Sequence, residues 1–120
     1  LVIQPWDVST INPISKAIQA SDIGITPMND GKVIRLTFPP LTEERRKELV
    51  KKVNVEGESC KVVVRSARRD AIENIKKAQK DGLSEDIAKG MEADVQELTD
   101  KYIAVVDARC KDKEKEIMTI

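Results

Sequence analysis

The stretch that decides the fold is residues 42–82, which read TEERRKELVKKVNVEGESCKVVVRSARRDAIENIKKAQKDG. Thr42-Glu43-Glu44 supplies an N-cap and early negative charge, and no proline follows before Asp81-Gly82, a C-cap signal. Apart from one longer step that passes over Gly57, apolar residues advance by three or four positions: Leu49, Val53, Cys60, Val64, Ala67, Ala71, Ile75 and Ala78. This spacing predicts one helix with a single apolar stripe, about 60 Å long.

A second long helix is predicted immediately after the first, because Ser84-Glu85-Asp86 is again a cap signal. Its apolar positions, over about 50 Å, are Ile87, Met91, Val95, Leu98, Tyr102, Val105 and Ile117. The short Gly82-Leu83 connection predicts that the two helices are antiparallel. Residues 42–82 hold 12 Lys/Arg against 8 Asp/Glu, a net of +4, and residues 84–118 hold 6 against 10, a net of −4. These opposite charges favour the pairing.

The apolar surface of the pair is wider than one partner helix needs. Val63 and Ile72 lie beside the main stripe of the first helix. Wide stripes are typical of a bundle with a third helix, which this sequence does not contain.

Residues 1–40 form a different unit, because all five prolines of the chain occur there. The expected elements are a strand at Val2–Trp6, a helix from Asn12 as N-cap and Pro13 as first residue to about Ser21, a turn at Met28–Gly31 and a strand at Val33–Phe38. Pro39 and Pro40 then act as a stiff joint. The chain is therefore predicted to be α+β, with a small β/α/β domain (1–40) and a long helical hairpin (41–120).

Composition excludes several classes of function. The chain has no His and no phosphate loop, nucleophile motif or metal-ligand cluster, so we predict that it is not an enzyme and holds no metal or cofactor. No segment reaches the roughly 20 apolar residues that span a bilayer, and the first residues do not resemble a signal peptide. Cys60 and Cys110 are predicted to be unpaired, since the hairpin register offsets them by about 7 Å.

The signs of charge are segregated around the first long helix. Lys and Arg lie on an arc beside the apolar stripe and form what we call the basic stripe: Arg68, Lys61, Arg65, Lys76, Arg69 and Lys80. Most acidic residues take the far side, and only Glu58 intrudes. One interpretation is a solvated face with i,i+4 ion pairs. The segregation of positive and negative residues instead favours binding to a phosphate backbone. Because aromatic residues are scarce, we expect the ligand to be structured RNA and not unpaired bases.

Several runs of sequence also resemble a known family. They are Ile11–Pro27, Asn29–Leu36, Pro39–Leu49, Val64–Ala71, Ser84–Asp86, Leu98–Tyr102 and Lys113–Met118. In this order, over essentially all 120 residues, the chain resembles the ribosome recycling factors, most specifically in its two arginine-containing runs.

The resemblance implies an L-shaped protein with a three-helix bundle and a β/α/β domain, joined by a hinge at Pro39 and Pro40. It implies a cytoplasmic or organellar translation factor that binds large-subunit ribosomal RNA. With elongation factor G, such a factor dissociates the post-termination ribosome, without a small-molecule substrate. Together with the basic stripe, it predicts these RNA-binding residues: Arg45, Arg46, Lys61, Arg65, Arg68 and Arg69.

The chain departs from the family pattern in two ways. Family members begin with a long helix and initial strands, about one third of their length, and this sequence begins after them. The absent helix is the third bundle member that the wide apolar surface needs. We also expect Asn54, Val55, Gly57 and Ser59 to occupy exposed helix positions.

Two other interpretations stay open. The first is a helical-hairpin interaction module whose apolar surface docks a partner helix, without RNA binding. The second is a decayed gene fragment without function.

Overall fold

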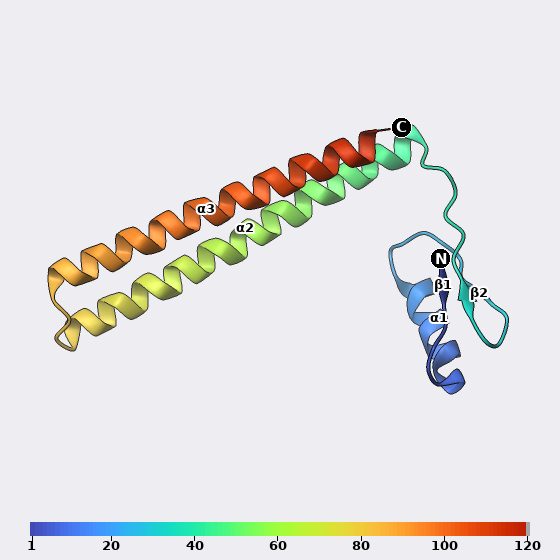
Figure 1. Ribbon diagram of the computed structural model, residues 1–120, viewed down its shortest axis with the longest axis horizontal. Coiled ribbons are helices and arrows are strands. Elements are labelled where there is room, and N and C mark those ends of the chain that lie inside the picture. Colours follow the sequence, from blue (N-terminus) through green and yellow to red (C-terminus); the bar gives the residue numbers. More distant parts are fainter. Residues whose placement is uncertain (120) are drawn as a thin grey trace. The chain divides into compact units, whose positions relative to one another are not determined.

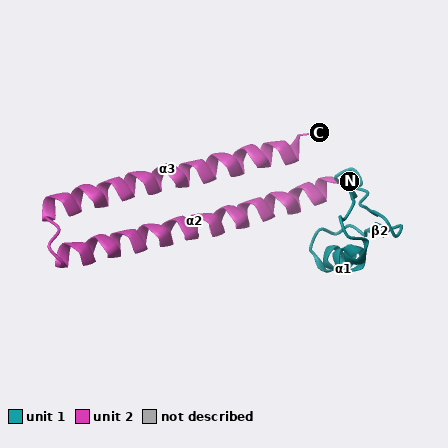
Figure 2. Cartoon of the chain, turned by 60° about the horizontal axis from the view of Figure 1, so that its bottom comes forward, with its two compact units in different colours: residues 1–41 teal, residues 42–120 magenta. Residues whose placement is uncertain are grey.

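The computed structural model describes residues 1–119, which divide into two compact units (Figures 1 and 2). The first unit comprises Leu1–Leu41, and the second begins at Thr42. The first contains a small sheet and a short helix, and the second contains two long helices, so the α+β class predicted from the sequence is confirmed.

The first unit is built on a three-stranded antiparallel sheet. Its elements are β1 (Val2–Ile3), a 3₁₀ turn (Val8–Thr10), α1 (Ile11–Ala20), β2 (Met28–Asn29) and β3 (Ile34–Arg35). The strand order is β1-β3-β2, so β3 is central. Its core is formed by Ile11, Ile34 and Leu36, with half-buried isoleucines packed around them.

Three sequence predictions for this unit need correction. The predicted first and last strands are longer than β1 and β3, and Met28–Asn29, predicted as part of a turn, pairs with β3 as a third strand. Asn12 is not the N-cap of α1, because Asp7 starts a 3₁₀ turn by accepting a hydrogen bond from the Ser9 amide at 2.9 Å, and this turn runs directly into the helix. Pro13, predicted as the first helical residue, is instead the third residue of α1, which is still within the first turn, where a missing amide proton costs little.

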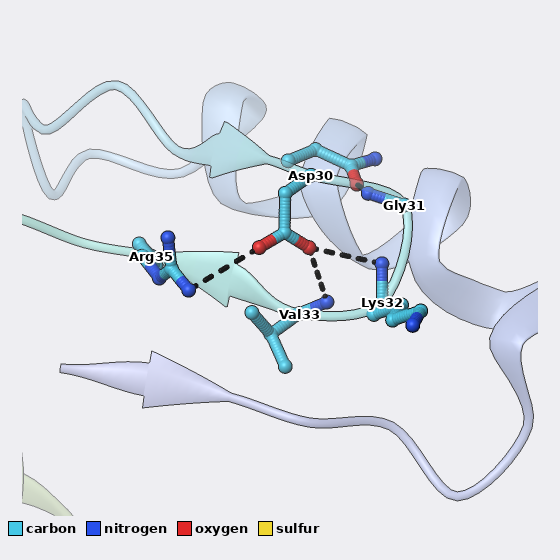
Figure 3. A network of polar contacts seen from close by, with 6 residues as sticks. Asp30, Gly31, Lys32, Val33 and Arg35 are labelled. Atoms are coloured by element: carbon cyan, nitrogen blue, oxygen red, sulfur yellow. Dashed lines mark hydrogen bonds and ion pairs between the residues drawn. The ribbon is translucent and has the colours of Figure 1, made fainter.

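Asp30 fixes the turn between β2 and β3 (Figure 3). Its Oδ1 accepts hydrogen bonds from the Lys32 amide at 3.0 Å and the Val33 amide at 2.9 Å. Its Oδ2 lies 3.4 Å from Nη2 of Arg35. Gly31 has a φ of 88°, a conformation that glycine adopts without strain. The turn therefore explains why Asp30-Gly31 follows β2 directly.

The second unit is an antiparallel hairpin of α2 (Glu43–Lys80) and α3 (Glu85–Met118), as predicted (Figures 1 and 2). The Thr42 side chain caps α2 and that of Ser84 caps α3. The α2 end is a Schellman motif, in which the Leu83 amide donates to the Ala78 carbonyl at 2.9 Å and Gly82 has a φ of 114°. The caps and the turn thus begin and end both helices where the sequence predicts.

The contact between α2 and α3 is rotated from the predicted stripe. Gly57, predicted to be exposed, is buried against Cys110, whereas Cys60, Ala67 and Ala78 are exposed. The reason is that glycine carries no side chain, so the partner helix approaches there and the line of contact passes through Gly57 instead of Cys60. Both cysteines are free thiols, as predicted.

The rotation leaves an exposed strip of apolar side chains on α3, which we call the apolar flank: Ile87, Met91, Leu98, Tyr102 and Val105. The residues of α3 that are buried are Ala88 and Thr99 instead. These side chains remain about half exposed within residues 1–119, which agrees with the expectation that the apolar surface exceeds what one partner helix needs.

Candidate nucleic-acid interface

The basic stripe follows one side of α2 because its residues recur at helical spacing. The span from Lys61 to Lys80 is 19 residues, or roughly 28 Å along the helix. Within residues 1–119, no helix combines the length and hydropathy needed to cross a bilayer. In the same part of the chain, no three His, Cys, Asp or Glu side chains gather closely enough to hold a metal ion.

Arg65 and Arg69 are the most available arginines of the stripe. Both side chains are exposed, and neither forms a hydrogen bond or ion pair with any part of residues 1–119. They are four residues apart, so they project from the same side of α2 one turn apart. Each guanidinium keeps five N–H donors for an external acceptor, and its planar fork matches two phosphate oxygens.

Lys61 differs because two carboxylates hold its ammonium group. Its Nζ lies 2.5 Å from Oδ1 of Asp107 and 3.0 Å from Oε1 of Glu58. Asp107 first, and then Glu58, raise the pKa of Lys61 above its ordinary value by stabilising the charged form. Only 16% of the Lys61 side chain is exposed. Its ammonium group is therefore less available to an external phosphate than the guanidinium groups of Arg65 and Arg69.

Arg68 is held at the junction of the two helices by a neutral partner. Its Nη1 donates a hydrogen bond to Oε1 of Gln96 on α3 at 3.1 Å. Its side chain also lines a groove of about 260 Å³ that runs between α2 and α3 beside Val64, Leu98 and Tyr102. The guanidinium therefore has a defined position and keeps its full charge.

Arg45 and Arg46 lie at the other end of α2, about 28 Å from Arg65. The Arg45 guanidinium forms an ion pair with Glu48 at 2.9 Å. Arg46 reaches α3, where its Nη1 donates to the carbonyl of Ile117 and, at 3.1 Å, to the carbonyl of Thr119. The role visible for Arg46 is to cap the carboxyl end of α3.

The six residues predicted to bind RNA therefore fall into two groups. The structure brings together Lys61, Arg65, Arg68 and Arg69 and leaves Arg45 and Arg46 apart. Sequence reasoning missed the α3 partners of the stripe, Asp107 and Gln96. The register set by the short Gly82-Leu83 turn was the signal that could have found them, since it places α3 residues of that range opposite the stripe.

Comparison with known proteins decides the family. The sequence model described as ribosome recycling factor matches residues 1–118. The chain belongs to the ribosome recycling factor family. Ribosome recycling factors are translation factors and not enzymes, which agrees with the lack of catalytic motifs in the sequence.

Individual recycling factors support the assignment. The chain is 53% identical to the ribosome-recycling factor of Lawsonia intracellularis over 121 residues, and 58% identical to that of Acetivibrio thermocellus over 121 residues. Each alignment covers 100% of this chain but only 64% and 66% of the relative, so the chain spans less than two thirds of their length. A solution structure of the ribosome recycling factor matches 99% of this chain and 63% of its own, with a TM-score of 0.66 and 44% identity.

Proposed function

We propose that this chain acts in ribosome recycling by binding ribosomal RNA of the large subunit along the basic stripe of α2. With elongation factor G as its partner, it promotes dissociation of the post-termination ribosome. The observation that supports RNA binding most directly is the pair of exposed guanidinium groups of Arg65 and Arg69, which have no partner within residues 1–119.

The physical basis is phosphate binding on a rigid rod. A two-helix hairpin presents its cations at fixed spacing, and each phosphate that it neutralises releases condensed counterions. Such binding reads the shape of folded RNA and needs no stacking aromatic residues. The proposed activity is therefore to bind ribosomal RNA and to act on the ribosome mechanically, as a rigid rod. It needs no bond chemistry, no cofactor and no small-molecule substrate, and it takes place where the ribosomes are, in the cytoplasm or in an organelle.

We further propose Pro39 and Pro40 as the hinge between the two units. Both prolines are exposed and lie in a segment without helix or strand, between β3 and α2. Proline has no amide proton and a fixed φ, so neither residue can extend the sheet or enter the interior of the helix. This chemistry supports a short, stiff connection.

The test is binding of the chain to isolated large ribosomal subunits over a range of salt concentrations. Arg65→Ala and Arg69→Ala should each weaken binding and lower the slope of log K against log salt by about one. The matched control is Arg109→Ala, because Arg109 is also exposed but lies on α3, outside the basic stripe. Affinity and slope that stay at the Arg109→Ala values in both variants would refute the proposed interface.

The apolar flank supports a second candidate function, a hairpin module that docks another helix. Leu98 and Tyr102 are about half exposed and line the groove described above. Gel filtration with and without ribosomal RNA fragments separates the two functions. Assemblies that form through the apolar flank and do not respond to RNA would favour the docking module.

A further inference from the structure

A hydrogen-bonded relay on α3 lies behind Arg68. The Nη1 of Arg68 donates to Oε1 of Gln96 at 3.1 Å, and Nε2 of Gln96 donates to Oδ1 of Asp100 at 2.9 Å. Gln96 and Asp100 are four residues apart, so they share one side of α3. The relay crosses from one helix to the other, and among the stripe arginines only Arg68 has such a contact within residues 1–119.

Asp100 determines which way the Gln96 amide points. A carboxylate can only accept hydrogen bonds, so it selects the NH₂ end of the amide and leaves the carbonyl oxygen for Arg68. The opposite orientation would place NH₂ groups against the guanidinium and an oxygen against the carboxylate, with no hydrogen bond in either place. The three groups therefore have one consistent arrangement.

The neutrality of Gln96 matters for RNA binding. Arg68 uses one of its five N–H donors on an uncharged oxygen, so its charge and its other donors remain available. Lys61 shows the contrasting case, because Asp107 and Glu58 compensate its charge directly. A side chain that is already held in one place also loses less conformational entropy when it meets a phosphate.

We propose that Gln96, oriented by Asp100, is a positioning residue that holds the Arg68 guanidinium ready for a phosphate of the ribosomal RNA. This inference rests on the proposed function and adds to it a residue of α3, outside the basic stripe. Arg65 and Arg69 bind without such support, so the relay makes Arg68 the preorganised member of the stripe.

The experiment measures binding of the chain to large ribosomal subunits for Gln96→Met, Arg68→Ala and the double variant. Gln96→Met keeps the length of the side chain and should weaken binding about two- to tenfold, the cost of immobilising one long side chain. Its salt slope should stay unchanged, because the Arg68 charge remains. Arg68→Ala should lower both affinity and slope, and Gln96→Met should have no further effect in the Arg68→Ala background.

Two further variants test the chemistry of the relay. Gln96→Glu should lower the salt slope, because a carboxylate would compete with phosphate for Arg68. Asp100→Asn keeps an oxygen acceptor for Nε2 and should bind better than Asp100→Ala. Gln79→Met is the matched control, because Gln79 is exposed on α2 and its side chain forms no hydrogen bond within residues 1–119.

The outcomes separate this inference from the proposed function. If Arg65→Ala and Arg69→Ala weaken binding but Gln96→Met binds like Gln79→Met, the positioning role is overturned and the proposed function stands. An equal loss from Gln96→Met with and without Arg68 would also overturn it, since Gln96 would then act independently of Arg68. If no arginine variant weakens binding, both proposals are overturned.

Discussion

Cys110 of α3 fills the space that a side chain at Gly57 of α2 would occupy. A Cβ atom added to Gly57 would lie 2.6 Å from Sγ of Cys110, well inside van der Waals contact. The same Sγ lies 3.9 Å from the carbonyl oxygen of Val53, one turn earlier in α2. The thiol therefore sits against the bare backbone of α2, and this contact helps to fix the register of the hairpin.

The first prediction is that Gly57→Ala destabilises the hairpin. In an exposed helix position, replacing glycine by alanine stabilises by about 1 kcal/mol. At Gly57 the added methyl group collides with Sγ, and overpacking of this kind costs about 1–3 kcal/mol. The expected net result is a loss of about 1 kcal/mol, measured by urea unfolding followed by circular dichroism.

Two controls decide whether the collision is the cause. Gly90→Ala should stabilise, because a Cβ at Gly90 of α3 would meet no atom within 4 Å. In a Cys110→Ala background the nearest atom to the added methyl group is the Cβ of residue 110 at 3.9 Å, so Gly57→Ala should there become stabilising. A destabilising effect that persists without the thiol would contradict the explanation.

Gly57 also shows what the sequence can and cannot predict about this fold. Helix bounds and antiparallel pairing follow from caps, a short turn and apolar spacing, all of which are local. The face of α2 that contacts α3 cannot be predicted in this way. A search for periodic apolar side chains passes over glycine, although glycine permits the close approach of the two helices. The prediction therefore placed Cys60 inside and Gly57 outside, and both assignments are wrong.

The candidate site also combines features that one helix predicts with features that depend on the pairing of α2 and α3. The grouping of Lys61, Arg65, Arg68 and Arg69 follows from helical spacing alone. Which of them stay available to a ligand depends on α3, because Asp107 and Gln96 approach only after the helices pair. A search confined to one helix cannot distinguish the held side chains from Arg65 and Arg69.

The second prediction is that Arg46→Ala loosens the open end of the hairpin. Arg46 donates to the carbonyls of Ile117 and Thr119, which the last turn of α3 leaves without a helical partner. Hydrogen bonds from charged donors contribute about 1.5–3 kcal/mol, and partial exposure here favours the low end. Amide hydrogen exchange should become faster in the last turn of α3.

Arg69→Ala is the control for this prediction, because it removes the same charge from a side chain without a partner in residues 1–119. It should leave exchange at the end of α3 unchanged. Equal exchange rates in Arg46→Ala and the unmodified chain would show that the cap contributes nothing.

The third prediction concerns the acid sensitivity of the first unit. Hydrogen bonds from the Val33 amide, then the Lys32 amide, and the charge of Arg35 hold the pKa of Asp30 below its ordinary value of 3.8. A depressed pKa in the folded state means that the carboxylate stabilises the unit above pH 3.8, and that this stability is lost as pH falls through the folded pKa. The amide proton shifts of Lys32 and Val33 should titrate with a midpoint below 3.8.

Asp30→Asn is the matched variant, because its amide oxygen still accepts from the backbone but does not ionise in this range. The two amide shifts should then show no titration near this pH. A midpoint at or above 3.8 in the unmodified chain would contradict the predicted direction.

The last prediction compares Ile75 with Leu98, two large apolar residues that the sequence places in equivalent stripes. Ile75 is 5% exposed, whereas Leu98 is 54% exposed on the apolar flank. Ile75→Ala removes buried contacts and leaves a cavity between the helices, so it should cost about 2–5 kcal/mol. Leu98→Ala removes a side chain that is already half in water and should cost less than about 1 kcal/mol. Urea unfolding of both variants gives the comparison, and equal losses would contradict the prediction, because the apolar flank would then hold α2 and α3 together as much as the line through Gly57 and Ile75 does.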